Sequence, residues 1–123
     1  MGSKKNILVD KIQTSITSFY SLSKYEDYNI YLSLSLKYHT YKHKNNFIND
    51  SSYYYTLKNV SNILANPEFV LYDYDKNSIK YFKKLKEYVC LGVKIDKDKA
   101  FVATFYPVNK KNILKLKKLL IMD

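Results

Sequence analysis

The fold is decided by PEFVLYDYDKNSIKYFKKLKEYVCLGVKIDKDKAFVATFYP, residues 67–107, in which apolar runs alternate with short polar breaks. The breaks at 75–77 (Asp-Lys-Asn) and 96–98 (Asp-Lys-Asp) have the composition of hairpin turns. Runs joined by such short turns predict an antiparallel meander, and we expect its third strand, apolar nearly throughout, to be central. The four predicted strands are Phe69–Tyr74, Ser78–Leu85, Tyr88–Ile95 and Lys99–Tyr106.

Helices are predicted both before and after this sheet in the sequence. From Asn6 to about Ser23, apolar residues recur at helical spacings. A second helix is expected to start with Ser51 or Ser52 as its N-cap and to end before Asn66-Pro67. A third opens at Asn109 and runs to about Ile121, with its lysines pointing outward.

The segment from Ile30 to Tyr41 has two interpretations. Leucines alternate with polar residues as in a strand, but a short strand could also turn into a helix near Ser35, with Ser35 as the N-cap. Either way, His39 and His43 share a face, because they are four residues apart. They would lie about 6 Å apart on a helix and roughly 13 Å apart on a strand. Only the helix would let both act on one scissile group without help from elsewhere in the chain.

This order of elements predicts an α+β fold: N-terminal helices, a four-stranded antiparallel β-meander and a C-terminal helix. The length of 123 residues is that of one domain. Its expected parts are an N-terminal helix (1–29), a helical segment with the histidines (30–66), the sheet (67–107) and the last helix (108–123). The chain has no apolar run of membrane-spanning length, so we expect no membrane partner. The lone Cys90 is expected to be a buried core thiol.

The net charge of the protein indicates which class of partner it binds. The chain carries 21 basic residues, all lysine, against 11 acidic ones, for a net charge of +10. Such an excess on a small protein favours a polyanionic partner, and nucleic acid before an anionic membrane surface. The alternative is a basic surface that only keeps the protein soluble. The run Tyr53-Tyr54-Tyr55 could stack on bases, although packing is the commoner role of helical tyrosines.

Several known sites are absent from the sequence. It contains no GxGxxG, GxxxxGK[ST], CxxC or HExxH motif, which excludes the common nucleotide and zinc sites. Two histidines with the carboxylate of Asp50 are too few ligands for a convincing metal site. We therefore expect neither a metal nor another cofactor.

The residues that remain as candidates for a catalytic site are His39 and His43, the hydroxyl-bearing Thr104 and Tyr106, and several lysines. Cleavage of RNA by its own 2′-hydroxyl needs a base, an acid and groups that stabilise the phosphorane, and histidine suits the first two because it titrates near neutral pH. Strand alternation places Thr104 and Tyr106 on one face, with the small Ala100 and Val102 behind them. Each of these residues also has an ordinary structural role: a solvated histidine, or a β-forming threonine or tyrosine.

The segment from His39 to Leu120 resembles small phage- and toxin-associated nucleases of the barnase–EndoU–colicin–RelE (BECR) superfamily. The resemblance rests on HTYKHK (39–44), ILANPEFV (63–70), VCLGVK (89–94) and FVATFY (101–106), in this order and spacing. It implies a pair of helices, a helix ending in Asn-Pro before the first strand, a four-stranded meander and metal-independent endoribonuclease activity. By this resemblance His43, Thr104 and Tyr106 match family positions, and His39 does so less closely. The family often uses arginine near the site, so here a lysine such as Lys42, Lys83 or Lys94 would have to bind the phosphate.

The expected function is thus a toxin-like endoribonuclease acting on tRNA, mRNA or rRNA, with a cognate inhibitor protein as a further partner. Its expected location is the cytoplasm, either of its own cell or of a target cell. Two alternatives remain: a non-catalytic RNA- or DNA-binding module, and a protein-interaction partner of the immunity or antitoxin type. The positive charge argues against the last, since inhibitors of basic nucleases are expected to be acidic.

Overall fold

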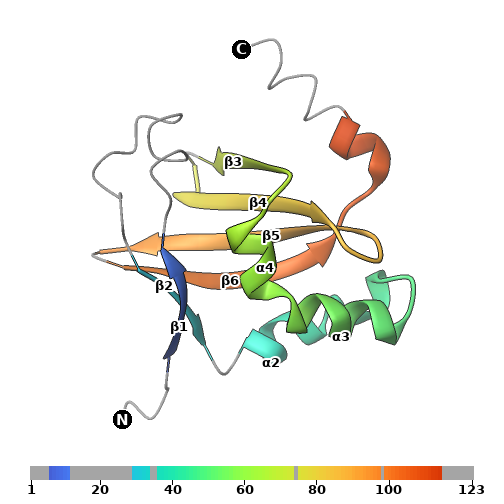
Figure 1. Ribbon diagram of the computed structural model, residues 1–123, viewed down its shortest axis with the longest axis horizontal. Coiled ribbons are helices and arrows are strands. Elements are labelled where there is room, and N and C mark those ends of the chain that lie inside the picture. Colours follow the sequence, from blue (N-terminus) through green and yellow to red (C-terminus); the bar gives the residue numbers. More distant parts are fainter. Residues whose placement is uncertain (1–5, 12–28, 34–35, 74, 98, 115–123) are drawn as a thin grey trace.

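The computed structural model describes residues 6–11, 29–33, 36–73, 75–97 and 99–114, and in this part of the chain the strands form a six-stranded sheet (Figure 1). The strand order is β1-β2-β6-β5-β4-β3. The strands are β1 (Asn6–Lys11), β2 (Asn29–Ser33), β3 (Phe69–Asp73), β4 (Ser78–Lys84), β5 (Tyr88–Asp96) and β6 (Lys99–Pro107).

The predicted antiparallel meander is confirmed as one part of this sheet. β3 pairs with β4, β4 with β5 and β5 with β6, all antiparallel. β5 lies between β4 and β6, and its residues 89–93 are all buried, as its apolar sequence predicted. Asn77 and Lys97 close the two hairpins with positive φ angles of 48° and 55°, the left-handed conformation that tight turns require.

The predicted N-terminal helix is wrong where the structure tests it. Asn6–Lys11 is strand β1, which pairs antiparallel with β2, while β2 pairs in parallel with β6 at Ile30–Ala100 and Leu32–Val102. A short apolar run such as Ile7-Leu8 fits a helix or a strand equally well, and here pairing with β2 decides. The sheet is therefore mixed and larger than the four strands expected. The rest of the predicted helix, residues 12–23, lies outside the described residues.

Among the described residues, four helical segments form between β2 and β3 and cover one face of the sheet (Figure 1). For residues 30–41 the alternative of a strand followed by a helix is confirmed, with Ser35 outside the described residues. The predicted 51–65 helix is two helices that meet at Asn59, and Asn49 caps the first by accepting a 2.8 Å bond from the Ser52 amide. The elements are α2 (Leu36–Tyr41), the 3-10 helix η2 (Lys44–Asn46), α3 (Asp50–Lys58) and α4 (Val60–Ala65).

The sheet has an apolar cluster on each face. We call the face under α2, α3 and α4 the helix face; its core includes Tyr53, Ile63, Leu91 and Phe105. On the other side, which we call the second face, Phe82 and Cys90 pack with Ile113. Ile113 belongs to a helix over 110–114, which starts one residue after the predicted Asn109; the Asn109 side chain accepts a 2.7 Å bond from the Lys111 amide. The predicted continuation beyond 114 lies outside the described residues.

Candidate functional site

A β-bulge in β6 decides which face Thr104 and Tyr106 occupy. Val93 of β5 pairs with Val102 and Gly92 pairs with Thr104, which leaves Ala103 as an extra residue. Ala100 and Val102 therefore pack into the core of the helix face, whereas Tyr106 packs with the cluster of the second face. The expectation that Ala100 and Val102 lie behind the two hydroxyl residues is wrong, because simple alternation does not include the bulge. Thr104 and Tyr106 still share a face.

Gly92 lies at the centre of the second face. Its cross-strand neighbours are Lys80 on β4 and Thr104 on β6, and residues paired in this way point to the same side of a sheet. A Cβ atom at Gly92 would lie 3.4 Å from the Thr104 Cγ2, so the threonine methyl group packs across β5 where the glycine has no side chain. The exposed Lys94 lies two residues further along β5 on this face. Thr104, Lys80 and Lys94 thus share this face with a position that has no side chain.

Tyr106 is half-buried and pairs across the sheet with Cys90, to which its hydroxyl group is hydrogen-bonded. Burial raises the pKa of the Cys90 thiol to about 11, against smaller opposing effects of the Tyr106 hydrogen bond and the Lys80 charge. Burial, together with the neighbouring Cys90, also raises the pKa of Tyr106 above the ordinary range of a phenol. Cys90 is fully buried, as its sequence context predicted. Tyr106 therefore stays a neutral phenol near pH 7 and can donate a hydrogen bond.

His43 lies beside the end of β6, next to Tyr106. It precedes η2, where its amide donates a 2.8 Å hydrogen bond to the Thr40 carbonyl and its own carbonyl accepts one of 2.9 Å from Asn46. Its half-buried ring lies 5.9 Å from the Tyr106 ring, centroid to centroid, with the planes tilted by 50°. The structure thus brings together two of the predicted site residues from segments more than 60 positions apart.

His39 lies in α2, and its side chain is outside the described part of the structure. α2 ends at Tyr41, so His43 is in the turn that follows and the two histidines do not share one helix. The distance between their rings therefore stays untested.

The three predicted phosphate-binding lysines lie in different places. Lys42 is exposed in the turn directly before His43, and Lys94 is exposed on the second face. Lys83 points to the helix face, because it pairs with Val89 of that core, and its ammonium group donates a 2.6 Å bond to the Asn66 carbonyl at the end of α4. It is therefore not brought together with Thr104 and Tyr106.

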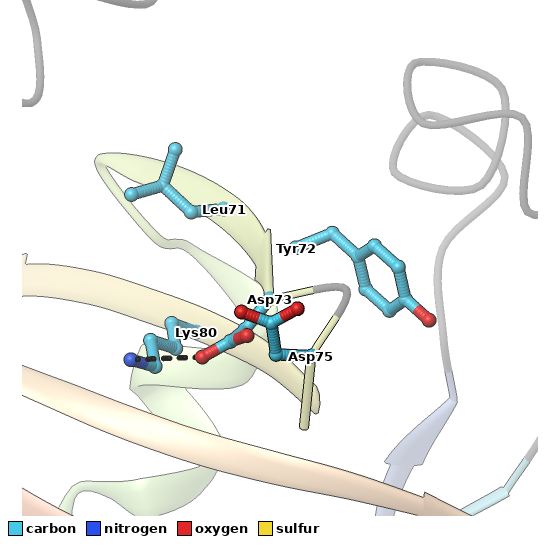
Figure 2. A pocket seen from close by; sticks show the side chains of 5 residues that line it. All are labelled: Leu71, Tyr72, Asp73, Asp75 and Lys80. Atoms are coloured by element: carbon cyan, nitrogen blue, oxygen red, sulfur yellow. Dashed lines mark ion pairs between the residues drawn. The ribbon is translucent and has the colours of Figure 1, made fainter. Parts of the chain in front are cut away.

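Lys80 is the charged residue of the second face that sequence reasoning did not select. Only the register of β4 against β5 places it opposite Gly92, and register is not visible in the sequence. Its ammonium group lies 3.5 Å from the Asp73 carboxylate, at a surface hollow also lined by Leu71, Tyr72 and Asp75. Figure 2 shows Lys80 reaching toward Asp73, while Tyr72 points away from this ion pair. Because two carboxylates line the hollow, it does not suit a phosphate.

Metal and membrane sites can be tested only for the described residues. Within them, no three His, Cys, Asp or Glu side chains lie close enough together to hold a metal ion. No helix among them is long and apolar enough to cross a lipid bilayer.

Comparison with known protein families gives a match that covers most of the chain. The model of a family described as phage-Barnase-EndoU-ColicinE5/D-RelE like nuclease3 matches residues 6–115, which include β1 to β6 and every candidate residue named above. Neither the curated proteins nor the solved structures contain a match to this chain.

Proposed function

The chain belongs to the phage-Barnase-EndoU-ColicinE5/D-RelE like nuclease 3 family, and on that premise we propose that it is a metal-independent endoribonuclease. The observation that carries the proposal is the contact of His43 with a neutral Tyr106 at the end of β6. Its substrate is cellular RNA, namely tRNA, mRNA or rRNA, and it acts as a toxin does, in the cytoplasm of its own or a target cell. A cognate inhibitor protein would fit this role.

The proposed reaction is transesterification. The 2′-oxygen of RNA attacks the adjacent phosphorus, the bond from phosphorus to the 5′-oxygen breaks, and the products are a 2′,3′-cyclic phosphate and a 5′-hydroxyl. His43 takes the proton from the 2′-hydroxyl as general base. Tyr106 donates a hydrogen bond to a phosphate oxygen as negative charge develops there. His39, in α2 just before the turn that carries His43, is the proposed acid that returns a proton to the departing 5′-oxygen, a role that requires this turn to keep the two rings close to one another.

The phosphate needs positive charge and hydrogen-bond donors beside these residues. Thr104 supplies a hydroxyl group from the same strand and face as Tyr106. Lys94 supplies an ammonium group on that face, and Lys42 supplies one next to His43. Lys80 adds a charge near Gly92 that Asp73 partly neutralises. Lysine acts here as a point charge, without the bidentate geometry of arginine.

The test is incubation of the purified protein with total RNA in EDTA, beside His43→Ala. We expect discrete fragments that end in 2′,3′-cyclic phosphate, and a rate at least about 100-fold lower for the variant. Binding of an uncleavable 2′-O-methyl RNA should change little. In His43→Gly, added imidazole should restore part of the rate, because it replaces the missing base without altering the fold.

Three results would change the proposal. Full cleavage by folded His43→Ala would remove this residue from the mechanism. Loss of activity in EDTA that returns with a divalent cation would replace the metal-free reaction. Salt-sensitive RNA binding without cleavage by the wild-type protein would favour a non-catalytic binding module on the same scaffold.

A further inference from the structure

A group of tyrosines and lysines lies on the surface outside the proposed catalytic residues. Three of them surround the turn after α2: Lys44 places its ammonium group 4.9 Å from the centre of the Tyr41 ring and 5.6 Å from that of Tyr54. A second pair follows along α3, where the Lys86 ammonium group lies 5.2 Å from the centre of the Tyr55 ring. We call Tyr41, Lys44, Tyr54, Tyr55 and Lys86 the tyrosine–lysine strip.

Helical spacing makes this strip continuous. Asp50 and Ser51 stand one turn before Tyr54 and Tyr55 on α3, so these four residues share one side of the helix. Lys44 pairs with Asp50 at 3.2 Å, and Lys86 donates a 2.9 Å bond to the Ser51 hydroxyl group. Both lysines are thus held at the side where the tyrosines emerge.

Two of the three rings of the strip are exposed, whereas Tyr54 is half-buried against the core. Tyr41 is 52% exposed and Tyr55 is 42% exposed, while their neighbour Tyr53 is fully buried in the core. In the run Tyr53-Tyr54-Tyr55, Tyr53 therefore packs in the core, as expected for a helical tyrosine, whereas Tyr55 is exposed to solvent. An exposed aromatic ring with an ammonium group on one side can stack a base on the other.

Charge indicates which partner such rings would meet. The chain carries +10 overall; of the carboxylates near the strip, Asp50 pairs with Lys44, and Glu87 accepts hydrogen bonds from the Ile48 amide and the Ser52 hydroxyl group. The Asp50 hydrogen bond, aided by the Tyr41 hydroxyl group, raises the pKa of Lys44, so it remains a cation. Flat rings alternating with ammonium groups match the alternation of bases and phosphates in a single strand. A duplex hides its base faces and would not use the rings.

We propose that the tyrosine–lysine strip binds single-stranded RNA next to the cleavage site, with bases stacked on Tyr41 and Tyr55 and phosphates near Lys44 and Lys86. Tyr41 is two residues from His43 in the chain, so a strand leaving the site would reach the strip directly. This inference rests on the proposed function and adds to it the class of substrate, which is unpaired RNA.

The test measures binding of a fluorescent 2′-O-methyl single strand, which lacks the nucleophilic hydroxyl group and stays intact, and of the same sequence as a duplex. We expect the wild-type protein to prefer the single strand. Tyr41→Ala with Tyr55→Ala should weaken that binding at least about tenfold, and the matching phenylalanine variant should keep it. Because Tyr41 also packs against Tyr53, with ring centroids 6.3 Å apart, Tyr55→Ala alone provides a variant without that core contact.

The controls separate stacking from bulk charge. Lys44→Gln with Lys86→Gln, and Lys110→Gln with Lys111→Gln, each lower the net charge by two, but the second pair lies on the helix over 110–114. Equal losses from the two pairs, or unchanged binding in the tyrosine-to-alanine variants, would overturn the strip. Cleavage that depends on His43 together with such unchanged binding would refute the strip alone. Strip-dependent binding without any cleavage would refute the proposed function alone.

Discussion

At the scale of single residues, the state of Tyr106 follows from its cross-strand neighbour. Cys90 is fully buried at the centre of the sheet and keeps its proton because a thiolate there would be poorly solvated. Tyr106 is hydrogen-bonded to it, and the loss of the phenolic proton would bring a negative charge into the same cluster. The pair therefore favours neutral groups, which suits a hydrogen-bond donor and not a nucleophile.

This pair predicts a loss of stability in alkaline solution. Burial raises the pKa of Cys90 from 9.0 to about 11, so between these values the unfolded chain releases a proton that the folded chain retains. The free energy of unfolding should be unaffected below pH 9 and then fall by about 1 kcal/mol per pH unit up to pH 11. Urea unfolding at a series of pH values measures the slope. Cys90→Ala should show a smaller slope, and an equal slope would contradict this assignment.

The hydroxyl group of Tyr106 can be tested without disturbing its ring. Tyr106→Phe keeps the contact with His43 but removes the donor, and we expect RNA cleavage to slow by about 100-fold, as when one donor to a transition state is removed. Tyr88→Phe is the matched control, because Tyr88 lies on the same face and its hydroxyl group is bonded to Glu68 at a distance of 3.3 Å. Equal rates for the two variants would exclude Tyr106 from catalysis.

The sequence could predict part of this site. Residue type and order were enough to select His43, Thr104 and Tyr106, and the structure brings His43 and Tyr106 into contact. It could not predict that Ala103 forms a bulge, nor that Lys80 lies opposite Gly92, because both depend on pairing between strands that are distant in the chain.

At the scale of elements, Glu87 connects the sheet to the helices. From the turn between β4 and β5, its carboxylate accepts a 2.9 Å bond from the Ile48 amide and a 2.6 Å bond from the Ser52 hydroxyl group. Ile48 follows the turn that carries His43, and Ser52 is in the first turn of α3. One side chain thus holds both ends of the connection between η2 and α3.

Truncation of this carboxylate should loosen the connection. We expect Glu87→Ala to lower the free energy of unfolding by about 2 kcal/mol, since hydrogen bonds to charged groups are among the stronger ones. Glu68→Ala removes a carboxylate whose bond to the Lys84 amide is exposed, and it should cost less than about 1 kcal/mol. Urea denaturation of both variants makes the comparison. A smaller loss for Glu87→Ala than for Glu68→Ala would contradict the role of Glu87.

Elements with local determinants were predicted well. The hairpin turns, the four strands of the meander and the end of α4 before Pro67 all follow from residues close together in the sequence. Strand β1 was not predicted, because Ile7 and Leu8 are compatible with a helix until β2 supplies backbone partners. The break between α3 and α4 at Asn59 was not predicted. There the Asn59 side chain donates a 2.7 Å hydrogen bond to the Tyr55 carbonyl, which competes with continuation of the helix.

At the scale of the whole molecule, charge and fold act on different steps of the proposed reaction. The net charge of +10 attracts RNA toward the molecule, and the lysines that contact the strand neutralise its phosphates. The sheet, in contrast, fixes Tyr106 and Thr104, and the turn after α2 fixes His43 and the start of the tyrosine–lysine strip. Capture of RNA should therefore depend on salt, and the chemical step should not.

This division predicts how salt acts on each step. The logarithm of the association constant for the 2′-O-methyl single strand should fall linearly with the logarithm of the salt concentration. Lys44→Gln with Lys86→Gln should reduce the slope of this line by about 1.4, because each phosphate that the variant no longer neutralises contributes about 0.7. Lys110→Gln with Lys111→Gln removes equal charge outside the strip and should leave the slope nearly unchanged. At saturating RNA, the cleavage rate should stay constant between about 50 and 200 mM salt. A saturated rate that falls as steeply as binding would show that salt also disturbs the catalytic groups, and charge and fold would then not act separately.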